Sequence, residues 1–179
     1  ADVYAVGSDE TKEWLRAVGR LCGREREAEE VICTEEAAFQ RAVEEVRPTL
    51  SERRVTFAIG RDINWFQPKI VMRILKRAGV ELAGVVLLDS FLPGRREVME
   101  EEVARLTDAP IAHEGSREAE ALFKAADFVL TTHELTDARL RQIFLALMPS
   151  VGWSMEKKLL RDMVHIVCRH ESRGGLIYG

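Results

Sequence analysis

The chain has 179 residues, of which 46% are hydrophobic and 31% are charged, and its formal net charge is −4. A chain of this length can bury about two-thirds of its unfolded surface as one compact domain. The acidic balance, with Glu and Arg intermixed, argues against a nucleic-acid partner. No apolar stretch is long enough to span a membrane and the N-terminus lacks a signal-peptide pattern, so we expect a cytoplasmic protein with no membrane partner.

The N-terminal part of the chain predicts two helices. The first is indicated by side chains that recur with helical spacing, namely Trp14, Leu15, Val18, Leu21 and Cys22. Ser8 is a plausible N-cap for this helix, which should end near Gly23. The second helix is predicted for residues 25–46, with Pro48 stopping it. Its outer face is dense with Glu and Arg, which indicates a solvated surface rather than an acidic binding surface.

Residues 54–89 read as a strand, a loop, a helix and a second strand. The first apolar run ends at Gly60, an amphipathic helix closes at Gly79, and an almost wholly apolar run follows. This order is typical of a βαβ crossover in a parallel sheet. Because ligands of such sheets bind outside the carboxyl ends of the strands, the loop after Gly60 is the first place to look for function.

The alternation of helices and strands continues to the C-terminus. We predict helices after Pro93 and Gly94, after Ser116, around Leu140, Ile143, Phe144 and Leu147, and over residues 153–168. Strands are predicted for residues 110–113 and 127–132, with a short extended piece at 148–151. The predicted fold is an α/β, Rossmann-like three-layer domain with a mainly parallel sheet, preceded by two N-terminal helices. Its expected division is a helical segment, residues 1–50, packing on an α/β domain, residues 51–179.

The residues at the predicted strand ends are the candidate ligand-binding set. They are Gly60, Arg61, Asp62, Asn64, Trp65, Asp89, Ser90, Thr132 and His133. A cationic side chain and an exposed aromatic ring after the first strand suit an anionic or planar ligand. The alternative is that Trp65 and Phe66 simply pack on the following helix. The chain has neither GxGxxG nor GxxxxGK[ST], so binding of a nucleotide by a glycine-rich loop is not supported.

Metal binding and covalent catalysis find little support in the sequence. Cys22 and Cys33 lie on separate predicted helices, and His165 and Cys168 share a helix rich in Met, Leu and Val. A buried cysteine in such a helix is usually a small hydrophobic residue. No serine lies in a nucleophile-elbow sequence. We therefore assign no metal ligands and no catalytic residues.

The order of the segments resembles one known family. The relevant passages are GSDETKEWLRAVGRLCG, EEVRPTLSERRVTFAIG, RAGVELAGVVLLD, ADFVLTTHE and VGWSMEKKLLRDMV. They are similar to the component 1 family of nitrogenase-like oxidoreductases, in which a Gly-x-x-x-Thr-x-x-x-Leu helix is matched here by Gly7, Thr11 and Leu15. A long charged helix leading into an Arg/Lys-Val strand is matched at Arg54 and Val55.

The resemblance implies a fold and a redox function. Members include nitrogenase MoFe protein subunits, cofactor-assembly scaffolds, and reductases of chlorophyll and nickel-tetrapyrrole biosynthesis. They are built of three Rossmann-like domains, assemble as homo- or hetero-oligomers, and receive electrons from an ATP-dependent iron–sulfur protein. Their cluster-binding cysteines come mainly from an N-terminal domain that has no counterpart in these 179 residues. The family's cofactor-binding histidine is missing too, because Met148 to Gly152 occupy its place, which argues against a FeMo-type cofactor.

The resemblance thus implies a domain of a nitrogenase-like reductase subunit or assembly scaffold. Its strand-end loops would wall a cavity for a metallocluster or tetrapyrrole, an iron–sulfur cluster included, and the isolated chain would be inactive. The alternative is a non-catalytic, flavodoxin-like module that binds a ligand, regulates or interacts with a protein. A phospho-receiver is one version, since Asp89 and Thr131 end strands, but the paired acids and late lysine of receivers are missing. A further alternative is a pure scaffold protein that is held in its assembly through the charged second helix.

Overall fold

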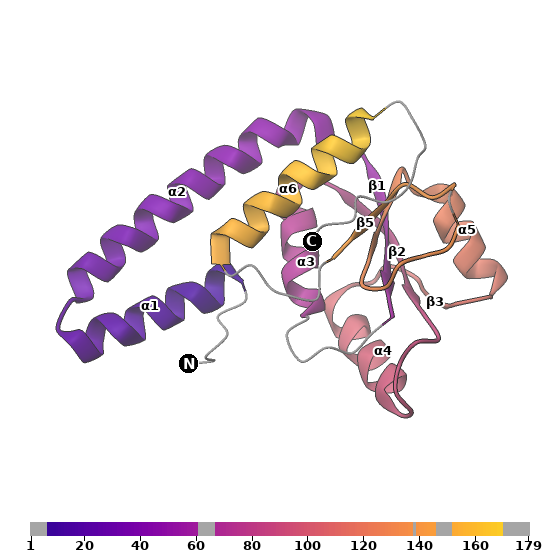
Figure 1. The fold of residues 1–179 in the computed structure, drawn as a ribbon, viewed down its shortest axis with the longest axis horizontal. Coiled ribbons are helices and arrows are strands. Elements are labelled where there is room, and N and C mark those ends of the chain that lie inside the picture. The colour runs from indigo at the N-terminus through magenta and orange to yellow at the C-terminus, as the bar shows by residue number, and fades with distance from the viewer. Residues whose placement is uncertain (1–6, 61–66, 138, 146–151, 170–179) are drawn as a thin grey trace.

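The structure is a computed structural model that describes residues 7–60, 67–137, 139–145 and 152–169 (Figure 1). The helices of these residues are α1 (Ser8–Cys22), α2 (Glu25–Leu50), α3 (Pro68–Ala78), α4 (Arg95–Leu106), α5 (Arg117–Ala125) and α6 (Gly152–Cys168). The strands are β1 (Arg54–Ile59), β2 (Glu81–Leu87), β3 (Ile111–His113), β4 (Phe128–Thr131) and β5 (Gln142–Phe144). No described helix is both long and apolar enough to cross a membrane.

The five strands form one sheet in the order β3-β2-β1-β4-β5. Every pair is parallel, and β1 lies at the centre between β2 and β4. The chain moves outward from β1 to β3 on one side and then crosses β1 to place β4 and β5 on the other. The prediction of an α/β fold with a parallel sheet is confirmed.

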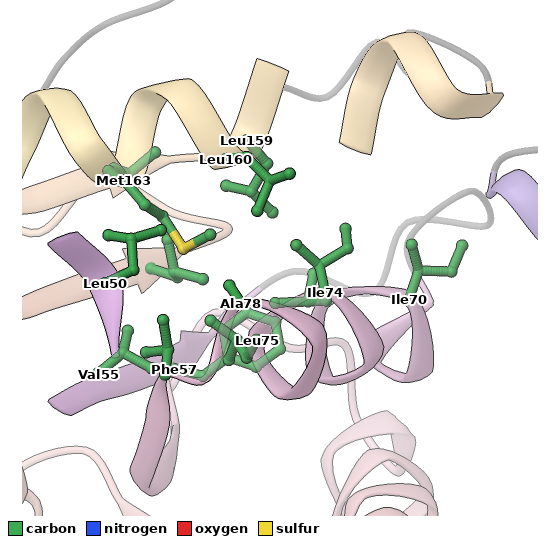
Figure 2. Close-up of a cluster of buried hydrophobic side chains, with 14 of the residues drawn as sticks. Leu50, Val55, Phe57, Ile70, Ile74, Leu75, Ala78, Leu159, Leu160 and Met163 are labelled. Atoms are coloured by element: carbon green, nitrogen blue, oxygen red, sulfur yellow. The ribbon is translucent and has the colours of Figure 1, made fainter. Parts of the chain in front are cut away.

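The two faces of the sheet differ in what covers them. Along β1, Val55, Phe57 and Ile59 belong to a large cluster with side chains of α2, α3, α4 and α6, and we call this side the α3/α6 face. Figure 2 shows α3 and α6 side chains approaching each other beside Phe57. Ala58 belongs to a smaller cluster with α5, on the side that we call the α5 face. The alternation follows from the two-residue period of a strand.

The two N-terminal helices form a hairpin that extends away from the sheet (Figure 1). The C-terminal half of α2 packs on α3 and α6 and buries Phe39, Val43 and Leu50. In the middle of α1 Trp14 is 40% exposed, and near the far end of the hairpin Leu21 is 87% exposed. The predicted helices are therefore present, but the apolar side chains of the far end do not reach the core.

Pro48 does not stop the second helix as predicted. The helix α2 continues through it to Leu50, and Ser51 N–H still bonds to the carbonyl of Arg47. In the last turn a proline removes a single backbone hydrogen bond. The fully buried side chain of Leu50 holds this last turn against the core.

The helix predicted around Leu140, Ile143 and Phe144 is also wrong, because Gln142–Phe144 is β5. The amide of Leu145 bonds to the carbonyl of Thr131, and Val129 N–H bonds to the carbonyl of Arg141. These bonds to β4 satisfy backbone groups that a helix would have paired locally. The predicted extended piece at 148–151 lies outside the described residues.

Candidate functional site

The ends of β1, β2 and β4 bring the candidate residues to one edge of the sheet. Ile59 is the partner of Leu87 in β2, and Ala58 is the partner of Thr131 in β4. The residues that follow these strands therefore meet at the carboxyl edge. The strand order reverses between β1 and β4, and ligands of open α/β sheets bind in the crevice at such a switch point.

Gly60 lies at the centre of this edge, and both of its backbone groups are bound by side chains from the neighbouring strand ends. Its N–H donates to the hydroxyl of Thr132 over 2.8 Å, and its carbonyl accepts from the hydroxyl of Ser90 over 2.6 Å. A Cβ atom at Gly60 would lie 2.5 Å from Ser90 Oγ and 3.0 Å from His133 Cβ. The close approach requires glycine here, and the two hydroxyls fix the point where the loop leaves β1.

Asp89 is exposed, and its groups are engaged with neighbours along the same edge. Its backbone N–H donates to Glu114 Oε2 over 2.6 Å, and its carboxylate accepts from Arg96 Nη1 over 2.9 Å. Glu114 and Arg96 were not identified from the sequence. Glu114 is 25 residues away from Asp89 and is brought there by the pairing of β2 with β3, whereas Arg96 lies seven residues away in α4.

His133 is exposed beside Gly60. Thr131 Oγ1 donates to the carbonyl of His133 and accepts from its N–H, so the backbone turns tightly after β4. The exposed side chain of His133 therefore leaves the backbone beside Gly60, at the switch point. Of the candidate set, Arg61, Asp62, Asn64 and Trp65 lie outside the described residues.

A second polar cluster joins the first residues of α1 and α6 to the middle of α3. The carboxylate of Glu156 is fully buried, and its Oε1 accepts from Ser8 N–H over 2.9 Å and from Arg73 Nη2 over 2.7 Å. Ser8 was predicted to be the N-cap of the first helix, but Gly7 is the N-cap and no side chain of α1 caps it. The sequence did carry a signal for Glu156, because it lies three residues after Trp153 and four before Leu160, on the apolar stripe of the helix.

Two carboxylates near this cluster, those of Glu10 and Glu36, have a lowered pKa. Partial burial alone would raise the pKa of Glu10, but a hydrogen bond from Lys69 and the charge of Arg73 outweigh it and lower the pKa. Burial opposes ionisation of Glu36 as well, yet hydrogen bonds from Lys12, Arg77 and Trp153 lower its pKa to about 2. The groups that pair with Glu36 come from α1, α3 and α6, so one carboxylate of α2 ties four helices together.

The described residues include no group of three or more His, Cys, Asp and Glu side chains that could hold a metal ion. All three cysteines are free and exposed, and they lie on α1, α2 and α6 rather than at the strand ends. Among the described residues beside Gly60, His133 carries an imidazole and the others contribute hydroxyls and backbone groups. The described edge can therefore form a wall, but it does not supply a ligand set for a metal cluster.

A comparison with models of known protein families shows which family the chain belongs to. Residues 3–167 match the family model described as nitrogenase component 1 type oxidoreductase. The chain belongs to this family. The resemblance found in the order of the sequence segments is thus confirmed over nearly the whole chain.

Solved structures of the nitrogenase component 1 type share the fold. One, titled "Nitrogenase Cp1 at pH 5", is 13% identical with a TM-score of 0.59 over 92% of this chain and 41% of its own. Another, "Nitrogenase Cp1 at pH 6.5", is 14% identical with a TM-score of 0.55 over 91% and 43%. The chain thus spans about two-fifths of the length of these structures. A comparison with curated proteins finds no match.

Proposed function

We propose that the carboxyl edge of the sheet forms one wall of a ligand cavity in a nitrogenase-like reductase subunit or cofactor-assembly scaffold. The observation that carries this proposal is the bond from Gly60 N–H to Thr132 Oγ1, which bridges β1 and β4 at the switch point. The close approach of Ser90 and His133 to Gly60 leaves little room for a side chain at that position, and the exposed His133 would lie beside the ligand. Membership of the nitrogenase component 1 family supports a redox setting for such a cavity.

The proposed ligand is a metallocluster or a tetrapyrrole. Most of the protein groups that coordinate it would come from outside this chain. The three cysteines are remote from the strand ends, so an iron–sulfur cluster would need donors from another domain or subunit. We propose that a homologous subunit supplies that second wall and that an ATP-dependent iron–sulfur protein supplies electrons, in the cytoplasm. The bound metallocluster or tetrapyrrole would carry the electrons. Ser90 and Thr132 would hold the cavity wall in place, and His133 would contact the bound group at the edge of the cavity.

The residues at positions 1–50 enter the proposal as a supporting segment rather than as part of the wall. In the described part of this segment, residues 7–50, the buried side chains share a cluster with those of α3 and α6, which pack on the sheet from the α3/α6 face. The predicted division at residue 50 stays a prediction. It places the ligand edge wholly in the α/β part.

The test compares two histidines at the same edge. Protoporphyrin IX is titrated into the protein by absorption and tryptophan fluorescence, and the protein is also purified anaerobically for iron analysis. His133→Ala should weaken porphyrin binding about tenfold or more, the equivalent of 1.4 kcal/mol. His113→Ala is the matched control, since His113 is exposed at the end of the outer strand β3 and pairs with Glu100. Neither porphyrin binding nor iron in the unchanged protein, or equal losses in both variants, would overturn the proposal.

A further inference from the structure

The outer face of α1, on the side away from α2, carries exposed apolar side chains. On the inner side Arg16 pairs with α2, and the two helices run side by side (Figure 1). Trp14 and Leu21 are two and five residues from Arg16, so the helical period places them on the opposite face. Both are exposed, and the half-buried Ala17 and Val18 lie between them. Together these four side chains form one apolar patch along α1.

Two opposite charges follow the same face at the same spacing. Glu13 precedes Trp14 and Arg20 precedes Leu21, so each pair is seven residues apart, close to two helical turns. Both charged side chains are exposed. Within the described residues neither of them forms an ion pair, since the neighbouring Arg16 is already bound by α2. The patch is therefore flanked by an available carboxylate at one end and an available guanidinium at the other.

This pattern is self-complementary for a second copy of α1 in the antiparallel direction. With a twofold axis beside Ala17, Trp14 of each copy lies opposite Leu21 of the other. Glu13 of each copy then lies opposite Arg20 of the other, on the same side of the interface, which gives two ion pairs of opposite charge. A parallel pair would instead place like charges opposite each other. Because Ala17 is small, the two helix axes can approach closely where they cross.

We propose that the outer face of α1 is a homodimer interface in which two copies of this helix pack antiparallel. The interface is formed by Glu13, Trp14, Ala17, Arg20 and Leu21. Such an interface uses the same patch on both copies, as twofold symmetry requires. The inference goes beyond the proposed ligand site and does not depend on it, because these residues belong to α1 and not to the carboxyl edge of the sheet. Two helical turns from each copy make a small interface, so the dimer should be weak and should form as protein concentration rises.

The first test reverses the two charges one at a time. In a dimer of Glu13→Arg two pairs of positive charges face each other, and in a dimer of Arg20→Glu two pairs of negative charges do. Each variant alone should therefore dimerise about tenfold or more weakly than the unchanged protein, as measured by sedimentation equilibrium. An equimolar mixture of the two variants should regain the lost affinity, because every charge then faces an opposite one. Weakening without recovery in the mixture, or no weakening at all, would overturn the antiparallel interface.

The second test addresses the apolar patch. Leu21 is 87% exposed, so Leu21→Glu should leave the urea midpoint unchanged while it weakens dimerisation about tenfold or more, because the new carboxylate would be buried unpaired in the interface. Leu92→Glu is the matched control, since Leu92 is 71% exposed and lies before α4, outside the proposed interface. Equal weakening by both variants would overturn the inference. A monomer at every concentration of the unchanged protein would do so as well, and would assign the patch to a different partner.

Discussion

The two faces of the sheet are built from side chains of different size, although the same strands supply both. On the α3/α6 face, β1 places Val55, Phe57 and Ile59 in one cluster with side chains of α2, α3, α4 and α6. On the α5 face half of the buried cluster is alanine, namely Ala58, Ala112 and Ala119, and none of it is aromatic. Stability should therefore reside mainly in the area buried on the first face, whereas the second face should be sensitive to added volume.

The largest expected effect is the loss of a large side chain on the α3/α6 face. Phe57→Ala should lower the free energy of unfolding by about 3–5 kcal/mol, because Phe57 is fully buried and leaves a cavity. Val129 lies on the α5 face in β4, between β1 and β5. Val129→Ala removes two buried carbon atoms and should lower the free energy of unfolding by about 1–2 kcal/mol, at roughly 0.8 kcal/mol for each. Urea unfolding measures both. Equal losses would contradict the division of the core into a major and a minor face.

The next effect is overpacking on the α5 face. A Cβ at Gly84 would lie 2.6 Å from Leu122 Cδ2 and 2.8 Å from the carbonyl oxygen of Pro110. Gly84→Ala should cost about 1–3 kcal/mol, since backbone as well as side chain must shift. The double variant Gly84→Ala, Leu122→Ala should show coupling, because the shortened Leu122 side chain removes one of the two collisions. Additive losses measured by urea unfolding would indicate that α5 does not pack closely on β2.

A smaller effect is expected from the hydroxyl that joins β1 to α5. Thr56 is fully buried, and its Oγ1 donates to the carbonyl of Leu122 over 2.8 Å. Thr56→Val should cost about 0.5–1.5 kcal/mol, the usual net contribution of such a bond. Thr34→Val is the matched control, because Thr34 Oγ1 makes the same kind of bond to Glu30 at an exposed position of α2. A loss as large in the control would assign the effect to the Thr→Val exchange itself rather than to the buried bond between β1 and α5.

The smallest effect is the loss of stability in acid that comes from Glu36 of α2. The pKa of Glu36 in the folded protein is about 2, below its usual 4.5. Its contribution to stability is therefore complete above pH 4.5 and is lost as the pH falls toward 2. Glu36→Gln should flatten the fall in urea midpoint between pH 5 and 2.5. Asp137→Asn should not, although the Arg139 side chain also holds the pKa of Asp137 at about 2, because that pair is exposed.

The sequence predicted the parts of the fold that depend on local patterns. The βαβ unit over residues 54–89 was identified from apolar runs and the glycines that end them, and β1, α3 and β2 follow it closely. The strand β5 was missed, since Leu140, Ile143 and Phe144 have spacings that fit a helix as well as a strand. Only the backbone bonds to β4 decide between them.

The candidate site, like the fold, could be predicted from the sequence only in part. A parallel sheet must bring its strand ends to one edge, which is why the positions of Gly60, Ser90 and Thr132 could be expected to meet. That both hydroxyls bind the backbone of Gly60 depends on the strand register, which no pattern in the sequence specifies. The Glu156 cluster depends on how α1, α3 and α6 meet, so the spacing along α6 could indicate a buried glutamate without indicating its partners.

The uneven burial of α2 has a consequence for its motion. A helix of 26 residues is roughly 39 Å long, and its last part carries the buried Phe39, Val43 and Leu50, while near its start Val31 is 48% exposed. Amides near Leu50 should exchange only through global unfolding of the protein. Those near Glu25 should exchange through local opening of the hairpin end, at a far lower free energy. One continuous helix therefore belongs to two units of cooperative unfolding.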